Sequence, residues 1–310
     1  MAKDKIVDPA YTREILKKVR QIEIRTRKAV TDSLAGSYHS SFKGQGMDFE
    51  EVREYSPGDD VRSIDWNVTA KMNLPFIKKY REERELTITL MVDLSASGDF
   101  GSAMQTKRER AAEIASLLAF SAVRNNDNVG LLLFTDHVEH YLPPKKGRQH
   151  ILRVIRDILF YEPSKKKTDI VQSLKFLNGI LKKQAVVFLI SDFLMDIPLA
   201  KDRKNNELIK ILSLTRRRHD LVCISLMDPR ELELPKMGVV NLEDAETGEV
   251  VCLNTSDTKV RTLYRELNHA RRDNLKRMFT QSGIDHVEIS TGMPYVQSLQ
   301  AFFKLRSGKR

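Results

Sequence analysis

Downstream of Leu86, short apolar runs alternate with segments of helical period. The apolar runs lie at 86–92, 129–134, 185–190, 221–227 and 284–289. Apolar residues recur three or four positions apart in the intervening segments 107–124, 148–160, 169–183, 207–217, 258–280 and 295–305. The runs are typical of strands buried on both faces, and the longer period is typical of amphipathic helices. The alternation predicts an α/β fold class with a doubly wound, mainly parallel central sheet and helices on both faces.

The rest of the chain predicts additions to this sheet. An edge strand is expected at 137–142, where the chain runs into two prolines. Two short apolar runs flank Glu246-Thr247-Gly248 and predict an inserted β-hairpin near residues 232–255. Residues 9–35 have a helical apolar stripe, whereas residues 36–73 are rich in turn-forming clusters and have no helical period.

These patterns predict two regions. Residues 1–84 are expected to form an N-terminal helix and a turn-rich or β segment that packs on the main domain, residues 85–310. The segment 36–66 is too short and too rich in turns to bury a core of its own, so we expect it to depend on that main domain.

Short oxygen-bearing side chains follow two of the predicted strands. Asp93-Leu94-Ser95-Ala96-Ser97 comes directly after the first strand, Asp192 follows the third, and Thr168 lies in a loop immediately before a helix. In a doubly wound sheet, ligands bind outside the carboxyl ends of the strands. Two carboxylates and three hydroxyls suit a hard cation such as Mg²⁺ or Mn²⁺, which prefers oxygen ligands.

The sequence therefore predicts a divalent-cation site, most naturally for Mg²⁺, made of Asp93, Ser95, Ser97, Thr168 and Asp192. We expect these side chains to cluster at the carboxyl edge of the sheet. The alternative is that Ser97 or a neighbour only caps a helix, because Ser and Asp are common at helix starts.

Composition, charge and the absence of known catalytic motifs exclude some classes of function. Hydrophobic residues make up 41% and charged residues 30% of the 310 residues, a balance typical of a folded protein. The net charge of +10 is compatible with an acidic partner, but the basic residues are dispersed among acidic ones. We therefore expect no nucleic acid as partner. The chain contains none of the GxxxxGK[ST], GxSxG and HExxH motifs, and Ser95 stands where a haloacid dehalogenase would need its second Asp. These features favour a non-catalytic protein.

The subcellular localisation is also predicted from the sequence. The first ten residues lack the apolar stretch of a secretory signal, and the apolar runs, such as 185–190, are too short to span a bilayer. The chain has two cysteines, Cys223 and Cys252, both in strand-like contexts, which predicts buried thiols rather than a disulfide framework. We expect a cytoplasmic protein without a membrane span.

The order of the candidate ligands resembles the von Willebrand factor A fold and its metal-ion-dependent adhesion site. The upstream segment 44–71, with DPRELELP and EDAETGEV downstream, is similar to family 58 among the domains of unknown function. The upstream residues that carry this similarity are Gly44, Gly46, Phe49, Arg53, Tyr55, Gly58, Asp59, Asp60, Arg62, Asp65 and Trp66. Gly98 departs from the family, in which many members have Met, but the oxygen ligands are intact.

This resemblance implies a role as an adaptor or chaperone-type protein that works with a MoxR-type AAA+ ATPase. The leading hypothesis is a protein-binding protein whose metal accepts an Asp or Glu from a partner. Two alternatives stay open at this point. One is a Mg²⁺-dependent hydrolase of phosphoesters, in which Asp93 or Asp192 serves the metal and the acidic stretch 59–65 assists. The other is a basic nucleic-acid-binding module.

Asp59, Asp60 and Asp65 surround Arg62 in the family-like segment. They are interpreted as a turn at Ser56-Pro57-Gly58-Asp59 followed by pairing between aspartates and Arg62, rather than as a second acidic site. Trp66 is expected to be a packing anchor.

Overall fold

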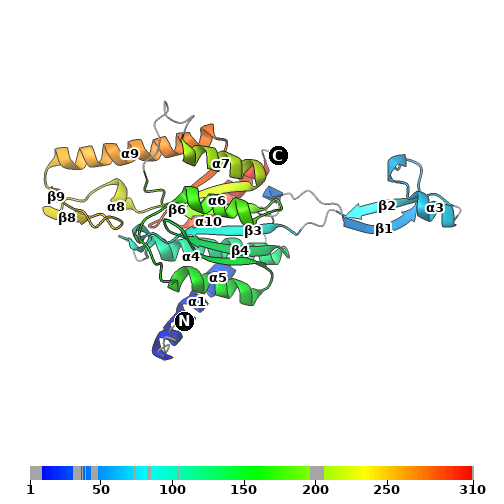
Figure 1. The fold of residues 1–310 in the computed structure, drawn as a ribbon, viewed down its shortest axis with the longest axis horizontal. Coiled ribbons are helices and arrows are strands. Elements are labelled where there is room, and N and C mark those ends of the chain that lie inside the picture. The colour runs from blue at the N-terminus through cyan, green and yellow to red at the C-terminus, as the bar shows by residue number, and fades with distance from the viewer. Residues whose placement is uncertain are drawn as a thin grey trace. The chain divides into compact units, whose positions relative to one another are not determined.

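The computed structural model describes residues 9–30, 36, 38, 40–42, 48–72, 74–81, 85–102, 105–195 and 206–308. Its contacts divide the chain into two compact units, one made of residues 1–41 and 87–310 and the other of residues 42–86 (Figure 1). The N-terminal helix thus belongs to the larger unit, while the family-like segment forms the smaller one. The packing of residues 36–66 on the main domain stays a prediction.

The larger unit is built on a six-stranded sheet with the order β10-β7-β6-β3-β4-β5. Its strands are β3 (Thr87–Asp93), β4 (Asn128–Phe134), β5 (Val138–Lys145), β6 (Val186–Ser191), β7 (Asp220–Met227) and β10 (Asp285–Ser290). All neighbours are parallel except β5, which is antiparallel to β4. Numbered in chain order, the six strands run 3-2-1-4-5-6 across the sheet, the doubly wound order. The predicted fold class is confirmed.

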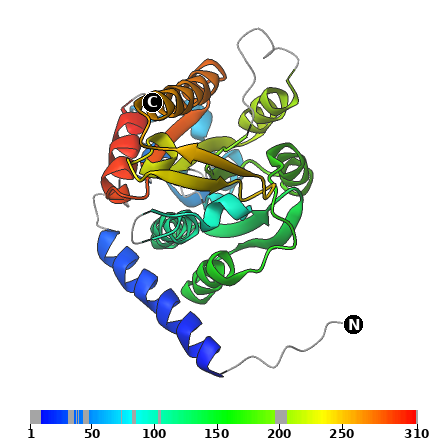
Figure 2. The ribbon, with the colours of Figure 1, turned by 90° about the vertical axis from the view of Figure 1, so that its left-hand side faces the viewer.

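Helices cover both faces of this sheet (Figure 2). One face carries α4 and α5, with α1 against them, and the other carries α6, α7 and the C-terminal part of α9; α10 packs on β10. Their bounds are α1 (Pro9–Ala29), α4 (Lys107–Arg124), α5 (Arg148–Phe160), α6 (Ile170–Ile180), α7 (Glu207–Arg218), α9 (Thr258–Gln281) and α10 (Tyr295–Ser307). Because helices shield both sides, every residue of β6 is buried, as its continuous apolar sequence predicts.

Most predicted elements begin and end within two residues of the observed ones. The predicted edge strand runs on through Pro143 and Pro144 to Lys145, which an edge tolerates because the missing N–H groups would face no further strand. The helix predicted from Asp169 to Lys183 is shorter. Asp169 accepts a hydrogen bond from the amide of Gln172 as N-cap, so α6 begins at Ile170 and ends at Ile180.

The smaller unit contains a two-stranded antiparallel sheet, β1 (Asp48–Glu54) with β2 (Phe76–Arg81). A 3-10 turn, η1 (Val61–Ser63), and a short helix, α3 (Trp66–Met72), lie between these strands in the sequence. Helix α3 was not predicted because seven residues are too few to show a helical period.

The acidic residues of this unit hold its turns. Asp59 pairs with Arg53 through both guanidinium nitrogens, at 2.9 and 2.7 Å, so the expected pairing with the Arg62 side chain is wrong for this residue. Asp60 accepts from the backbone amide of Arg62. Asp65 caps α3 and lies 3.3 Å from the ammonium of Lys78. Trp66 was expected to be a packing anchor, but its side chain is 69% exposed in the described part of the chain. The adjacent Asp65 is buried instead.

A β-hairpin made of β8 (Val239–Glu243) and β9 (Val250–Asn254) is inserted after α8 (Pro229–Leu232), as predicted. Cys252 on β9 is exposed, which corrects the expectation of two buried thiols, whereas Cys223 on β7 is buried. The sequence around Cys252 is apolar, but its strand belongs to a two-stranded hairpin whose residues are largely exposed. None of the helices in the described residues is long and apolar enough to cross a membrane.

One buried carboxylate ties the ends of two strands to the loop before α4. Asp228, which follows β7, accepts hydrogen bonds from the amide and hydroxyl of Ser102, the amide of Arg230 and the hydroxyl of Thr291. Burial alone would raise the pKa of Asp228, but these hydrogen bonds lower it below its ordinary value.

We therefore expect Asp228→Asn to lower the free energy of unfolding by about 2 kcal/mol at pH 7. Because the folded pKa is depressed, the stabilisation by Asp228 is present above its unfolded pKa and is lost as the pH falls through the folded value. Urea unfolding between pH 3 and pH 7 measures this, and the variant should lose less stability than the natural protein on acidification. The exposed Asp273 on α9 provides the control variant Asp273→Asn. Equal effects of the two substitutions would contradict the assignment.

Candidate metal-binding site

The predicted site residues lie around the point where the strand order of the sheet reverses. Asp93 ends β3 and Asp192 directly follows β6, and these two strands are parallel neighbours in the middle of the sheet. Loops leaving the two strands diverge here, which leaves room for a ligand at the carboxyl edge. This edge faces the viewer in Figure 2.

Backbone hydrogen bonds hold the loops of the site together. The amide of Leu94 donates to the carbonyl of Phe134 at 2.8 Å, and the amide of Ala96 donates to the carbonyl of Lys166 at 3.0 Å. The amide of Asp169 donates to the carbonyl of Thr135 at 2.9 Å. The loop that carries Thr168 is thereby fixed against the loops that follow β3 and β4.

The carboxylate of Asp93 is the centre of the cluster. Its Oδ1 accepts from the amide of Ser95 at 2.9 Å, and its Oδ2 accepts from the hydroxyl of Ser191 at 2.7 Å. The hydroxyl of Thr168 lies 3.4 Å from each of its oxygens. In the part of the chain that the structure describes, these polar contacts of Asp93 include no ion pair. Burial, and next the nearby charge of Asp192, raise the pKa of Asp93 to about 7.

The two serines that follow Asp93, Ser95 and Ser97, also face one another. The hydroxyls of Ser95 and Ser97 lie 2.9 Å apart, and both side chains are buried. Ser95 makes no side-chain cap at the short 3-10 turn η2 (Ala96–Asp99) that follows it. With Asp93 and Asp192, both serines line a hollow of about 10 Å³, which is room for one water-sized particle. Gly98 lines the same hollow.

Asp192, unlike Asp93, is paired with a lysine side chain. The ammonium of Lys107, the first residue of α4, forms ion pairs with Asp192 and with Glu231 of α8. Burial works against the charged form, yet the two carboxylates raise the pKa of Lys107 above its ordinary value. A lysine at a helix N-terminus opposes the helix dipole, so these two carboxylates offset an otherwise unfavourable position.

Thr168 also contacts the inserted hairpin. Its hydroxyl donates to Oε1 of Glu246 at 3.1 Å, across 78 residues of sequence. Burial, and the charges of Asp192 and Asp244, raise the pKa of Glu246, while the bond from Thr168 opposes that shift.

The donor set fits a hard divalent cation. Asp93 is a half-buried carboxylate without a cation partner among the described residues, and the hydroxyls of Ser191 and Thr168 contact it. The hydroxyls of Ser95 and Ser97 contact each other and line the same hollow. No group of three acidic, histidine or cysteine side chains suited to a metal occurs in the described ranges. A bound ion would therefore depend on neutral hydroxyls and water for much of its coordination, which Mg²⁺ accepts because it usually retains several waters.

Sequence reasoning missed four residues of this site: Ser191, Lys107, Glu231 and Glu246. A serine at the end of β6 was visible, and the position of Lys107 against the helix dipole was a usable signal. The contacts of Glu231 and Glu246 had no local signal, because each contacts residues far away in the sequence.

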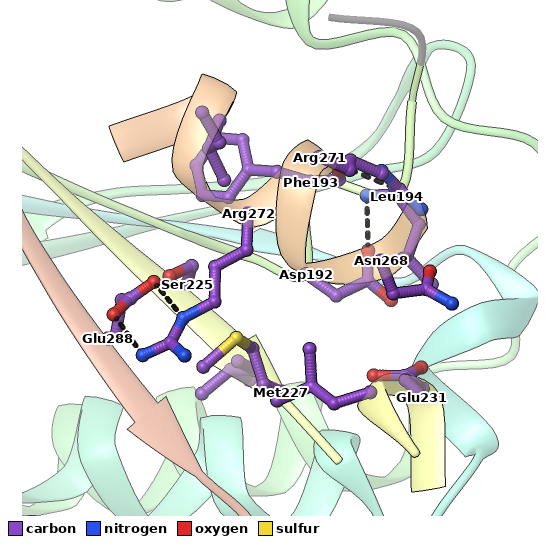
Figure 3. Close-up of a pocket in the computed structure, with 13 residues that line it drawn as sticks. Asp192, Phe193, Leu194, Ser225, Met227, Glu231, Asn268, Arg271, Arg272 and Glu288 are labelled. Atoms are coloured by element: carbon purple, nitrogen blue, oxygen red, sulfur yellow. Dashed lines mark hydrogen bonds and ion pairs between the residues drawn. The ribbon is translucent and has the colours of Figure 1, made fainter. Parts of the chain in front are cut away.

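A second pocket, of about 50 Å³, adjoins Asp192 (Figure 3). Its polar lining includes Asn268, Arg271 and Arg272 of α9, and its apolar lining includes Met227 and Leu275. Arg272 is bound to Glu288 through two hydrogen bonds, each of 2.9 Å. Figure 3 shows this pair and Asp192 at different sides of the pocket.

Comparison with protein-family models matches residues 51–274 to the family described as "Protein of unknown function DUF58". This chain belongs to that family. The matched region contains all five predicted ligands and the hairpin. Similar proteins include the uncharacterized protein Rv1480 of Mycobacterium tuberculosis, 29% identical over 290 residues, which are 93% of this chain and 88% of the relative. Another is the uncharacterized protein YeaD of Bacillus subtilis, 24% identical over 41% of this chain and 29% of the relative.

Solved structures with a related arrangement share little sequence with this family member. BatB from Bacteroides thetaiotaomicron is 12% identical, with a TM-score of 0.45, over 72% of this chain and 99% of that protein. The VWA domain of SpRpn10 is 15% identical, with a TM-score of 0.35, over 71% of this chain and 94% of that domain.

Proposed function

We propose that this protein binds other proteins through a divalent cation held by Asp93, Ser95, Ser97, Thr168 and Asp192, with Mg²⁺ as the natural ion. The observation that carries the proposal is the half-buried Asp93 carboxylate, which contacts the hydroxyls of Ser191 and Thr168 and lacks a cation partner among the described residues. When bound, the metal would supply a positive charge to which an Asp or Glu of a partner protein can bind.

The charge balance of the site supports binding rather than catalysis. Lys107 already offsets part of the charge of Asp192, so Asp93 is the anionic ligand that has no cation partner in the described part of the chain. A divalent ion held in this way keeps net positive charge and attracts a further carboxylate. A hydrolase would need a positioned general base beside the metal. Of the neighbouring glutamates, Glu231 is ion-paired with Lys107 and Glu246 accepts a hydrogen bond from Thr168.

Family membership supports a second part of the proposal. The resemblance implies that such proteins work beside a MoxR-type AAA+ ATPase, and we propose that this chain couples a client protein to such an ATPase. The client would bind the metal edge of the sheet.

Calorimetry with Mg²⁺ and Mn²⁺ is expected to give one bound ion per chain. Metal at a hundredfold excess over its dissociation constant should stabilise the fold by about 2.7 kcal/mol. Proteins captured from native lysate on the immobilised chain, including the ATPase, should be released by EDTA and recovered with Mg²⁺. Asp99→Ala, which removes an exposed carboxylate near the site, is the control and should behave as the natural protein. Capture that is indifferent to EDTA would reject the proposal.

A further inference from the structure

The inserted hairpin lies at the edge of the sheet where the candidate site lies. Figure 1 and Figure 2 both show β8 and β9 at the carboxyl end of the central strands. The loop between these strands, residues 244–249, contacts the site through the hydrogen bond from Thr168 to Glu246. The strands themselves are largely exposed, so this contact is not the result of a hairpin buried in a core.

The turn holds the backbone of Glu246 in one position. The carboxylate of Asp244 accepts from the amides of Glu246 and Thr247, at 2.8 and 3.0 Å. The amide of Gly248 donates to the carbonyl of Asp244 at 2.7 Å, and Gly248 has a φ of +75°, which favours glycine. The turn thus fixes the backbone position from which the Glu246 side chain reaches Thr168.

One hydroxyl faces two carboxylates at this contact. The Oγ1 of Thr168 is 3.1 Å from Glu246 and 3.4 Å from each oxygen of Asp93. A hydroxyl has a single hydrogen to donate, so it cannot satisfy both acceptors at once. A cation between them would offset their repulsion and leave the lone pairs of Thr168 free to coordinate it.

We infer that Glu246 is a built-in ligand of the metal site, which occupies the position that a partner's carboxylate takes when the partner binds. The inference rests on the proposed function, since it presumes the cation at Asp93. Lys107 already pairs with Asp192, so Glu246 is a second carboxylate at the site, beside Asp93, that has no cation partner among the described residues. Tethering gives it an effective concentration on the order of millimolar, and a partner must displace it.

The test uses Mn²⁺ alone as the probe, with water-proton relaxation to count the waters bound to the ion. Glu246→Gln should weaken Mn²⁺ binding by roughly fivefold or more, because an anionic ligand becomes neutral. It should also raise the relaxivity of the bound ion, because water fills the vacated position. Millimolar acetate should lower that relaxivity again in the variant and leave the natural protein unchanged.

Glu249→Gln is the matched control, because it removes the same charge from an exposed position of the same turn. If Mn²⁺ binds in a manner that needs Asp93 but Glu246→Gln and Glu249→Gln give equal affinity and relaxivity, the internal ligand is wrong while the proposed function stands. If Asp93→Ala leaves Mn²⁺ binding unchanged, the site itself is wrong and both proposals fall.

Discussion

Replacing Asp93 with Asn is expected to stabilise the metal-free protein at pH 8 and to abolish its stabilisation by Mg²⁺. Burial and the charge of Asp192 raise the pKa of Asp93 from 3.8 to about 7. A shift of that size corresponds to about 4 kcal/mol. The side chain is partly accessible to solvent, so we expect roughly half of this, about 2 kcal/mol.

The pH dependence has a definite sign. The folded pKa of Asp93 lies above the unfolded one, so its contribution is most favourable below the unfolded value and is lost as the pH rises through about 7. Without metal, the natural protein should thus lose this part of its stability between about pH 4 and pH 8, relative to Asp93→Asn. Thermal and urea unfolding in EDTA across this interval measure the difference. A metal-free Asp93→Asn protein that is less stable than the natural one at pH 8 would contradict the argument.

Asp93→Ala separates the functional hypotheses. It removes the uncompensated anionic ligand, so Mg²⁺ binding and partner capture should be lost together while the fold survives. Without the ion, a partner's carboxylate would meet Asp192 with less positive charge nearby and would be repelled. The hydrolase alternative predicts lost turnover with partner binding intact. A variant that still captures the same proteins in an EDTA-sensitive way refutes the adhesion-type mechanism.

The second large effect is expected from Lys107→Met. The side chain of Lys107 is 1% exposed, and its ammonium pairs with both Asp192 and Glu231. Removing one partner of a buried ion pair leaves uncompensated charge and typically costs about 3–5 kcal/mol. Denaturant unfolding in EDTA should show a loss of this size.

Metal should rescue part of that loss. In Lys107→Met the carboxylate of Asp192 has lost its ammonium, so it is available to a cation, and Mg²⁺ should bind more tightly than to the natural protein. The double variant Lys107→Met with Glu231→Gln is the control. It also removes the negative charge of one of the two carboxylates that lost their ion-pair partner, so it should be more stable in EDTA than Lys107→Met. If Mg²⁺ stabilises Lys107→Met no more than the natural protein, Lys107 does not offset the charge of Asp192 as we argue.

The sequence by itself determined the order and type of the main elements. Two local properties can be recognised without knowing which residues contact one another. They are the continuous apolar runs, such as 185–190, and the helical period of segments such as 107–124. The hairpin followed from Thr247-Gly248 between two apolar runs. The proximity of Asp93 and Asp192 followed from topology, since parallel strands end at the same edge of a sheet. The metal and its partner stay predictions.

Only the tertiary structure decided which groups surround the predicted ligands. Lys107 contacts Asp192 across 85 residues, and Thr168 contacts Glu246 across 78. The periodicity of apolar residues along a segment does not indicate such pairs, because the partner of a side chain depends on how distant segments pack. The same reason explains the exposure of Trp66 and Cys252. A tryptophan, or a cysteine in an apolar strand, can be buried, but the residues that would cover it lie elsewhere in the chain.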